Sequence, residues 1–557
     1  MTRRSWPYRV LIATTLFSII LIAGMRSDAR GPSTSTWLLV GLGDSLTHGT
    51  MDAHVNMLST SNAYLNQTAG LLAQSVTLLF SQPFLNDNEA RVVPFQIPTN
   101  VGIDGEDSFS IDGLEYYKRA GEAQSLFSSE YTADKFLPSQ FDDLHDAVLY
   151  PLNVFAWKPV TQMQSAEWLL KNFPTDRPKS PTIVVYWVGN NDSSTAALGF
   201  GGSNPTTIPL PPEQLKPVLP DIAGLLQWAE SQGQLSTQPY TAAMVDRNLT
   251  LLTDFATQQA TLINRLVNAS NGKEKHIFVL TLPYYSSIGY LMDSDDLEYY
   301  FRKVNPAYSV PLSFKRVNDP GQAIKNPLQG DRISLLTFGL MYALLGTGYS
   351  PAFVNEFLEV NGQQRDGLVL SEAEQQQIRD RIDGFNSVLR TLANSSGPNV
   401  HLVDIGNYLN QILTGQAQLV IRGKTISRKW IRGSAFSFDG VHPGYTGQAA
   451  IANYLIEDIN RALGMNAPLA SLENIIQTDP YIDRDNDGWA AGPNYTASGL
   501  NSLLFLFKDP DDTDAHIQVS LAPNVWRVIA QVLIKEIVER SRVVKTEAER
   551  RGLLLRQ

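Results

Sequence analysis

The sequence contains no cysteine among its 557 residues. Disulfides, thiolate metal sites and a cysteine nucleophile are therefore excluded, as is a lipid carried on an N-terminal cysteine. An excess of basic charge is also lacking, because 44 Lys and Arg stand against 55 Asp and Glu, for a formal net charge of −11. Such a balance gives no electrostatic footprint for nucleic acid, so we expect no nucleic-acid partner.

Low-complexity bias is absent as well. Hydrophobic residues make up 43% of the chain and charged residues 18%, a composition typical of folded globular proteins and not of disordered ones. At roughly 100–200 residues per domain, the length allows a main domain with large insertions and a smaller appendage. We therefore expect a globular protein with more than a minimal domain.

The N-terminus has the pattern of an export signal. Three arginines precede the apolar run Val10 to Met25, and Ser27-Asp28-Ala29 follows as a small-residue cleavage candidate. The run is short for a full span of about 20 residues, but the cleavage junction is imperfect. Residues 1–29 are thus expected to be a signal peptide or an N-terminal membrane anchor, with the rest of the chain secreted, periplasmic or membrane-anchored outside the cytoplasm.

Strand-like and helix-like patterns alternate along the chain. Continuous apolar runs of strand length occur at Trp37–Leu42, Val92–Ile97, Thr182–Trp187, Ile277–Leu282 and Val400–Val403. Helical periodicity covers Ser61–Phe80, Tyr240–Val267 and Ser371–Leu392, the last opening on a capping-box signal from Ser371 to Glu374. Continuous apolar strands alternating with helices predict an α/β fold whose sheet is mostly parallel and covered on both faces.

Three stretches do not belong to a minimal α/β unit. Residues 199–238 are rich in Gly, Pro and Ser, which predicts a long surface loop. Residues 284–369 form an aromatic insertion, and the length of its apolar run Ile333–Leu345 favours a buried cap helix over a membrane segment. As a cap, that helix could line an acyl or substrate pocket. A last amphipathic helix is predicted at 525–537, with its basic end either packed on the body or facing an acidic surface.

Within the C-terminal extension, residues 466–557, aspartates alternate in a loop pattern. Asp483, Asp485 and Asp487 precede a glycine, as in the first half of an EF-hand calcium loop. Position twelve of that loop is Asn494, where a bidentate Glu is expected. Two interpretations stay open: a structural calcium held by the three aspartates, or a solvated turn without metal.

The block Gly43 to Gly49 places Ser45 where a strand stops and the chain turns. Gly-Asp-Ser also favours simple turns, so a catalytic role needs partners: a serine hydroxyl requires a base, and the base an orienting group. Asp439 and His442 lie three residues apart in one loop, just before a helix predicted near Tyr445, and can supply both. The remaining histidines show no convincing carboxylate partner in the sequence and are interpreted as ordinary residues: His48, His54, His145, His276, His401 and His516.

A serine hydrolase also needs hydrogen-bond donors for the oxyanion of its tetrahedral intermediate. Residues 188–192 follow the strand that ends at Trp187, so an asparagine amide can project from a strand end. Residues 100–105 follow another strand candidate, and a glycine there leaves its main-chain N–H open to a ligand. Each stretch alone is equally consistent with an ordinary loop.

Taken in order, four blocks of the sequence resemble those of the SGNH (GDSL) hydrolase family, and in size its larger exported bacterial esterases and lipases. The blocks are Gly43-Asp44-Ser45-Leu46, Gly105, Gly189-Asn190-Asn191-Asp192 and Asp439-Gly440-Val441-His442-Pro443. The resemblance spans about Thr36 to Leu463. It implies a three-layer α/β/α sandwich with a flavodoxin-like sheet, here formed by residues 30–465 with the two insertions.

The resemblance also implies a role for each matching residue. Ser45 would be the nucleophile, His442 the general base and then acid, and Asp439 the group that orients it. The oxyanion donors would be the N–H groups of Ser45 and Gly105 and the side chain of Asn191. This chemistry implies a small-molecule or lipid ester as substrate and requires no metal or organic cofactor.

Two of the implied donors have competing neighbours. Asn190 adjoins Asn191, but Asn191 is the one that precedes Asp192, as the pattern requires. Gly102 lies close to Gly105. The insertions leave the kind of ester open, whether lipid, sugar acetate or another acyl compound.

A second interpretation belongs to a different functional class. The aspartate-rich loop, the predicted C-terminal helix and the aromatic insertion are also consistent with a calcium-dependent surface-binding protein. Such a protein would keep an esterase-like body without using it. Its weakness is that a non-catalytic body need not retain a complete set of serine, histidine, aspartate and oxyanion donors.

Overall fold

The computed structural model describes residues 36–114, 131–174, 180–198, 245–246, 248–269, 272–315, 330–346, 348–360, 363–364, 369–496 and 504–509. The chain divides into two units, Met1–Ser35 and Thr36–Gln557, and every described residue belongs to the second. Three predicted features lie outside the described residues: the export segment at 1–29, the loop at 199–238 and the helix at 525–537.

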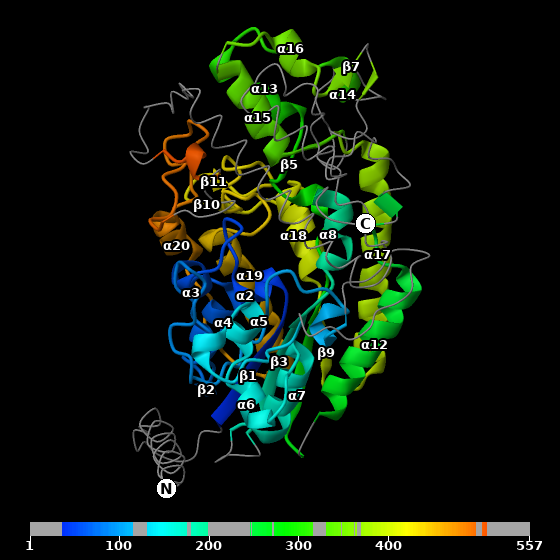
Figure 1. Ribbon diagram of the computed structural model, residues 1–557, viewed down its shortest axis with the longest axis vertical. Helices are drawn as coiled ribbons and strands as arrows, with labels where there is room; N and C mark the ends of the chain where they lie inside the picture. The colour runs from blue at the N-terminus through cyan, green and yellow to red at the C-terminus, as the bar shows by residue number, and fades with distance from the viewer. Residues whose placement is uncertain are drawn as a thin grey trace, which may run out of the picture. The chain divides into compact units, whose positions relative to one another are not determined.

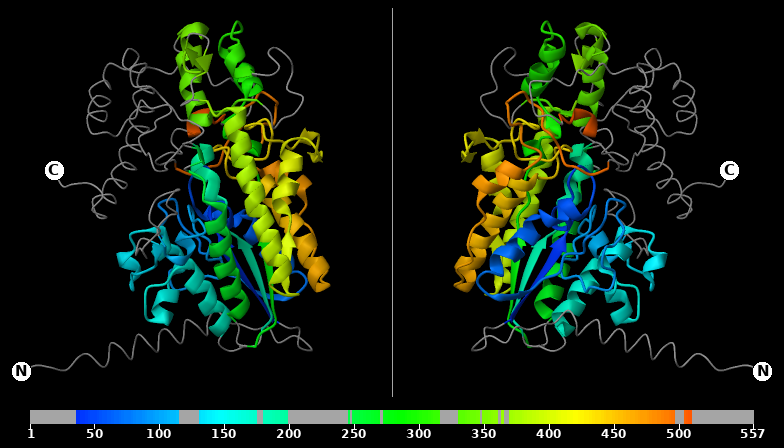
Figure 2. Two further views of the ribbon diagram at one scale, coloured as in Figure 1. Left: turned by 90° about the vertical axis from the view of Figure 1, so that its right-hand side faces the viewer. Right: turned by 90° about the vertical axis from the view of Figure 1, so that its left-hand side faces the viewer.

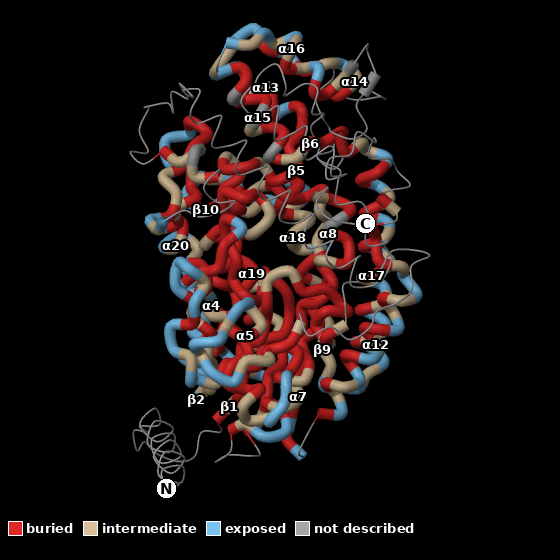
Figure 3. Tube along the Cα trace, in the orientation of Figure 1, coloured by how far each residue is buried: buried red, intermediate tan, exposed pale blue. Residues whose placement is uncertain are grey.

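Five parallel strands form the central sheet (Figure 1). They are β1 (Thr36–Gly43), β2 (Thr77–Leu79), β3 (Thr182–Trp187), β4 (Lys275–Leu280) and β9 (Val400–Val403). Their order β2-β1-β3-β4-β9 is the flavodoxin-like order when the strands are counted along the chain. The interior strands are buried on both faces (Figure 3), which explains their continuous apolar runs. The predicted α/β class is confirmed, and the sheet is entirely parallel.

Helices pack on both sides of this sheet (Figure 2). The main ones are α4 (Tyr64–Leu72), α7 (Gln162–Asn172), α12 (Leu252–Asn268), α17 (Glu372–Ser395), α18 (Ile405–Leu413) and α19 (Tyr445–Leu463). Helix α7 packs on β1 and α12, α17 packs on α12 and β9, and α4 packs on α19 across the opposite face. The capping box predicted between Ser371 and Glu374 forms at the start of α17.

The other described elements are shorter helices and three two-stranded antiparallel pairs. The short helices are α2 (Ser45–His48), α3 (Met57–Ser61), α5 (Leu144–Leu149), α6 (Leu152–Ala156), α8 (Asn191–Leu198), α13 (Ser294–Val304), α14 (Leu312–Lys315), α15 (Leu335–Gly346), α16 (Pro351–Asn355) and α20 (Leu472–Thr478). Three small antiparallel pairs are β5 (Leu291–Met292) with β6 (Ile333–Ser334), β7 (Glu359–Val360) with β8 (Gln363–Gln364), and β10 (Val420–Ile421) with β11 (Lys424–Thr425).

Three of the expected elements differ from the structure. The helix expected over Tyr240–Val267 begins only at Leu252, because a turn and a bend at residues 248–249 precede it. The helix expected over Ser61–Phe80 ends at Leu72, because the apolar residues after it continue as the edge strand Thr77–Leu79. The strand expected at Val92–Ile97 is replaced by turns and bends. Its central Pro94 has no N–H for a ladder, and the apolar side chains around it are exposed.

The apolar run Ile333–Leu345 of the insertion forms strand β6 and helix α15. Its length favours a helix of the globular body over a membrane segment. No helix among the described residues is long and apolar enough to cross a membrane. Helix α15 packs on α13, and Phe338 stacks on Phe301 with ring centroids 5.3 Å apart. The same Phe338 ring contacts Trp430 and Phe507, so the insertion and the C-terminal extension share one aromatic cluster.

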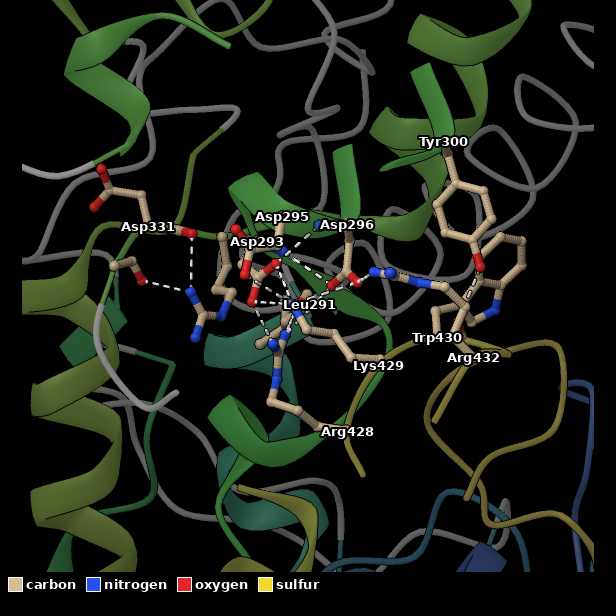
Figure 4. A network of polar contacts seen from close by, with 12 residues as sticks. Leu291, Asp293, Asp295, Asp296, Tyr300, Asp331, Arg428, Lys429, Trp430 and Arg432 are labelled. Atoms are coloured by element: carbon tan, nitrogen blue, oxygen red, sulfur yellow. Dashed lines mark hydrogen bonds and ion pairs between the residues drawn. The ribbon is translucent and has the colours of Figure 1, made fainter. Parts of the chain in front are cut away.

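A buried ionic network also fastens the insertion to the body (Figure 4). Asp293 caps α13 and forms an ion pair with Arg428 at 2.6 Å, both side chains being almost fully buried. Lys429 contacts the same carboxylate at 2.7 Å, and Arg432 contacts Asp296 at 2.7 Å. Removing one partner of such a pair leaves an uncompensated buried charge. The network therefore fixes the chain just before the Asp-x-x-His block.

Candidate active site

The candidate site lies where the strand order of the sheet reverses. Strand β1 connects to β2 on one side, whereas its other neighbour, β3, leads on to β4 and β9. Gly43 and Trp187, the last residues of β1 and β3, are paired in register. Ser45 and Asn190 follow directly, so the structure brings their two blocks together at the carboxyl ends of adjacent strands. Open α/β sheets bind their ligands at this position.

Asp44 connects the two strand ends. Its Oδ1 accepts the N–H of Leu46 at 3.0 Å, which caps the short helix that Ser45 opens. Its Oδ2 accepts the side-chain amide of Asn190 at 2.8 Å. Burial raises the pKa of Asp44 to about 6, although these hydrogen bonds act in the opposite direction. The sequence suggested only a turn residue at this position, because the contact with Asn190 is tertiary.

Helix α7 also holds the backbone just before Ser45, through the side chain of Gln162. Gln162 on α7 accepts the N–H of Gly43 at 2.8 Å and donates to its carbonyl at 3.0 Å. A Cβ atom at Gly43 would lie 2.6 Å from the carbonyl oxygen of Trp187. Glycine is therefore required at this position, and the turn that carries Ser45 is fixed relative to both β3 and α7.

His442 and Asp439 form a hydrogen-bonded pair. The Nδ1 atom of His442 lies 2.6 Å from Oδ2 of Asp439, which also accepts the N–H of Ala53 at 2.7 Å. The other oxygen of Asp439 accepts the N–H groups of Val441 and His442 and the hydroxyl of Ser437. Burial alone would raise the pKa of Asp439, but His442 and these donors hold it below its usual range. Asp439 thus stays ionised and fixes the ring.

The imidazole sits among three carboxylates. Burial lowers the pKa of His442, but Asp439 first, and then Asp104 and Asp44, outweigh this effect and raise it to about 9. Asp104 and His442 line one cavity, and the Asp104 carboxylate accepts a hydrogen bond from Thr50 at 3.1 Å. We did not predict Asp104 from the sequence, although it adjoins the predicted Gly105. Its effect on His442 depends on proximity in space.

One cavity of about 360 Å³ contains the candidate catalytic residues. Its lining includes Ser45, Asp439, His442, Asn190 and Asn191. Within the described part of the chain, no hydrogen bond joins the Ser45 hydroxyl to the imidazole. Such bonds are commonly long in unliganded enzymes and shorten when substrate binds.

A second cavity, of about 60 Å³, has an apolar lining and adjoins the first. The two share the side chains of Leu46, Pro283, Ile288 and Val441. The remaining wall comes mainly from α18 and α19. The apolar run Ile333–Leu345 was a candidate to line a pocket, but its described side chains line neither cavity, because α15 packs into the aromatic cluster.

The beginning of the insertion lines the main cavity instead. Tyr284, Tyr285 and Tyr290 contribute to its wall, and they directly follow the carboxyl end of β4. The Tyr285 hydroxyl donates to the carbonyl of Asn190 at 3.0 Å. The insertion thus shapes the cavity through its first residues and not through its central helix.

The predicted oxyanion donors are only partly assembled. The amide of Asn191 donates to the carbonyl of Glu106 at 2.9 Å, and the residue lines the cavity. Gly105 has a φ of +83°, which favours glycine, but the cavity is lined by its neighbour Asp104 and not by Gly105 itself. Gly102 is excluded as a donor, because its N–H donates to the side chain of Asn100.

Three of the remaining histidines are better partnered than the sequence suggested, and His516 lies outside the described residues. His145 lies 2.7 Å from the buried Glu106, and His54 and His276 each lie 3.2 Å from a glutamate. The expectation that they lack carboxylate partners was wrong for these three. His48 is fully buried, which lowers its pKa to about 4. Among the described residues, His442 is the one histidine that lines the cavity.

The structure also brings together the three aspartates of the C-terminal loop. Asp483, Asp485 and Asp487 each offer a carboxylate oxygen, and these oxygens lie within 4.8 Å of one another. This spacing is compatible with oxygen ligands around one cation, since Ca²⁺ binds oxygens at 2.3–2.6 Å. They lie apart from the residues that line the two cavities.

No protein-family model, curated protein or solved structure gives a significant match to the chain. What the cavity can do therefore follows from its own residues. A hydroxyl at a helix start, an imidazole paired with a carboxylate, and amide donors at one cavity are the groups that acyl transfer requires.

The effect of the nearby carboxylates on the pKa of His442 should be measurable by titration of the imidazole. We expect NMR to give a pKa for His442 well above 6.5 and near 9, so that the ring is charged at pH 7 and loses its proton as the pH rises. Asp104→Asn should lower this pKa, because it removes a nearby negative charge. His442→Gln would identify the signal, and Asp458→Asn, on the outer part of α19, would be the control. A pKa at or below 6.5 would contradict the prediction.

Proposed function

We propose that this protein is an exported serine ester hydrolase of the SGNH (GDSL) type. The observation that carries the proposal is the lining of one cavity by Ser45 and by the His442–Asp439 pair, joined at 2.6 Å. The four ordered sequence blocks support the same family. The N-terminal arginines and apolar run support export.

In the proposed mechanism the reactive form has a neutral His442, whose fraction rises as the pH approaches its pKa of about 9. The Ser45 Oγ attacks the carbonyl carbon of an ester while Nε2 of this neutral imidazole takes its proton. Asp439 stabilises the imidazolium through Nδ1. His442 then protonates the departing alcohol, which leaves an acyl group on Ser45. Water, deprotonated by His442, attacks this acyl group, and the acid is released as Ser45 regains its proton.

The tetrahedral intermediates carry a negative charge that needs donors. We assign these to the main-chain N–H of Ser45 and to the Asn191 amide, both of which line the cavity. The family resemblance adds the N–H of Gly105, whose neighbour Asp104 lines the cavity. The contact between Asn191 and the Glu106 carbonyl supports this assignment, because it holds the amide next to the Gly105 segment. Nucleophilic attack, proton transfer and stabilisation of the oxyanion are then all performed by side chains or main-chain groups of the protein.

The adjoining apolar cavity favours an ester with a hydrocarbon acyl chain. It is lined by residues such as Ile412, Leu413, Ala450 and Ile451 and opens beside Leu46, the neighbour of Ser45. An acyl chain directed into it would leave water and gain about 0.8 kcal/mol per CH₂. The substrate class proposed is therefore a carboxylic ester with a short to medium acyl chain, from a lipid or a smaller compound.

Loss of the nucleophile or base should abolish catalysis. Ser45→Ala and His442→Ala should each lower kcat for p-nitrophenyl butyrate by at least about 10⁴-fold, with unchanged circular dichroism. Ser61→Ala, an exposed serine in α3, should retain full activity.

A fluorophosphonate probe should label Ser45 in the same experiment and fail to label Ser45→Ala. Most of the activity surviving in either catalytic variant would refute the proposal. Labelling nowhere in the wild-type protein would favour the surface-binding protein with an inactive body.

The two adjacent asparagines should differ in effect. Asn191→Ala should lower kcat by about 10²–10³-fold with little change in KM, as expected for an oxyanion donor. Asn190→Ala removes the hydrogen bond to Asp44 and should mainly reduce thermal stability. The reverse pattern in kcat would assign the oxyanion role to Asn190.

Chain-length preference should depend on the apolar cavity. We expect kcat/KM for p-nitrophenyl esters to rise about fourfold per CH₂ from acetate until the cavity is filled. Ala450→Leu, which fills the cavity from α19, should abolish this rise while leaving acetate hydrolysis intact. Ala73→Leu, at an exposed position, is the matched control. A wild-type enzyme with no chain-length dependence would refute the assignment.

A further inference from the structure

The chain just before the aspartate-rich loop lies against the loop that carries His442. The Oδ2 atom of Asp479 accepts the N–H of Thr446, in the first turn of α19, at 2.7 Å. The ring of Tyr481 packs on Phe438 and Tyr445, with centroids 5.6 and 5.8 Å away. These contacts fall on both sides of His442 in the chain. Asp479 and Tyr481 thus brace the whole segment from Phe438 to Thr446.

A second route leads from Tyr481 to Asp439 through Asp52. The Tyr481 hydroxyl donates to Oδ2 of Asp52 at 2.6 Å, and Oδ1 of Asp52 accepts the N–H of Phe438 at 2.8 Å. The next residue, Ala53, donates its N–H to Asp439. Asp52 and Ala53 have φ values of 56° and 53°, a conformation that non-glycine residues keep only where surrounding contacts enforce it. The Tyr481 hydroxyl is one of those contacts.

The aspartate-rich loop begins two residues after Tyr481, and its carboxylates have unused oxygens. Asp483 is 4% exposed and Asp487 9% exposed. Oδ1 of Asp483 and Oδ2 of Asp487 are buried and have no hydrogen-bond partner within the described part of the protein. An unpaired buried carboxylate oxygen is costly. A cation between the converging carboxylates would compensate both.

Two lysines lie near this loop and offset part of its negative charge, Lys424 acting on Asp483 and Lys303 on Asp487. Lys424 donates to the main-chain carbonyl of Asp483, and Lys303 to that of Asp487. For the described residues, no ion pair links either lysine to the three carboxylates. The oxygens Oδ1 of Asp483 and Oδ2 of Asp487, unpartnered among the described residues, are therefore left for a further cation to coordinate.

We propose that Asp483, Asp485 and Asp487 bind a calcium ion, and that this ion holds Asp479 and Tyr481 against the loop that carries His442. Calcium is the cation assigned because it accepts several carboxylates in flexible geometry, whereas Mg²⁺ retains waters and demands a near-ideal octahedron. With the ion bound, the loop from Asp483 is fixed next to Tyr481. Without it, repulsion between the carboxylates loosens this brace.

The binding part of this proposal is independent of the proposed function, whereas its effect on turnover rests on that function. Binding is therefore tested in the full-length Ser45→Ala protein. We expect calorimetry to show saturable Ca²⁺ binding, and Tb³⁺ to give luminescence sensitised by Trp489, which adjoins the loop, with Ca²⁺ displacing it.

Asp483→Asn keeps an oxygen to accept the Gly488 N–H and should weaken Ca²⁺ binding by at least about 10-fold. The control is Asp142→Asn, in the other acidic cluster, formed by Asp142, Asp143 and Asp146, which should bind as before. Absence of Ca²⁺ binding, tighter binding of Mg²⁺ than of Ca²⁺, or loss of binding in the control alone would overturn the site.

Transmission to the loop is tested with Tyr481→Phe, which removes one hydroxyl and keeps the ring. This variant should bind Ca²⁺ with wild-type affinity. In the Ser45→Ala background, Ca²⁺ should slow amide hydrogen exchange of residues 436–446 by about 10-fold or more, as expected when a local opening costs over 1.4 kcal/mol more. In the same background, Tyr481→Phe should reduce this protection.

Activity gives the final comparison. Removing Ca²⁺ with a chelator should lower kcat of the wild-type enzyme several-fold and reversibly, with a smaller change in Tyr481→Phe. Ca²⁺ binding without altered exchange or kcat would overturn the coupling. A protein that binds Ca²⁺ and protects residues 436–446 but hydrolyses no ester would keep the site and refute only the proposed function.

Discussion

The contact between Asp439 and His442 is the constraint on which the rest of the site depends. A carboxylate is tolerated in the interior only if it is paired and hydrogen-bonded, and Asp439 obtains its donors from two loops far apart in sequence. The turn at Ala53 and the loop from Ser437 to His442 must therefore fold against each other. This requirement explains why the turn keeps a positive-φ conformation without glycine, and it fixes the imidazole independently of the contacts that hold Ser45.

The sheet contributes the opposite half of the cavity. Strands β1 and β3 end side by side, so Ser45 and the two asparagines need only short extensions to meet. Asp44 and Gln162 then hold those extensions rigidly. Negative charge accumulates around the ring as a result, because Asp44 and Asp104 join Asp439 near His442. The same acidic surroundings that strengthen the imidazole as a base keep it protonated at neutral pH.

The additions to the α/β body act on this cavity from outside. The insertion supplies tyrosines at its start, and its helices are fastened to the body by the ionic network around Asp293 and by the aromatic cluster around Phe338. The C-terminal extension reaches the same cluster through Phe507 and the His442 loop through Tyr481. The proposed calcium dependence is thus carried by the C-terminal extension, whereas the proposed acyl-chain selection belongs to helices α18 and α19 of the body.

The sequence by itself determined the fold class, and its resemblance to the SGNH blocks named Ser45, Asp439 and His442, which line one cavity. Apolar strand runs, a capping box and four short blocks sufficed for this, because burial, capping and turn chemistry are local properties of the chain. The edge strand after α4 and the false strand around Pro94 show where local patterns are ambiguous. Only the tertiary structure decided that Asp44 contacts Asn190, that Asp104 faces His442, that α15 avoids the cavity and that Tyr481 reaches Asp52. These contacts join residues distant in sequence, and their energies depend on burial and proximity in space, which no local pattern specifies.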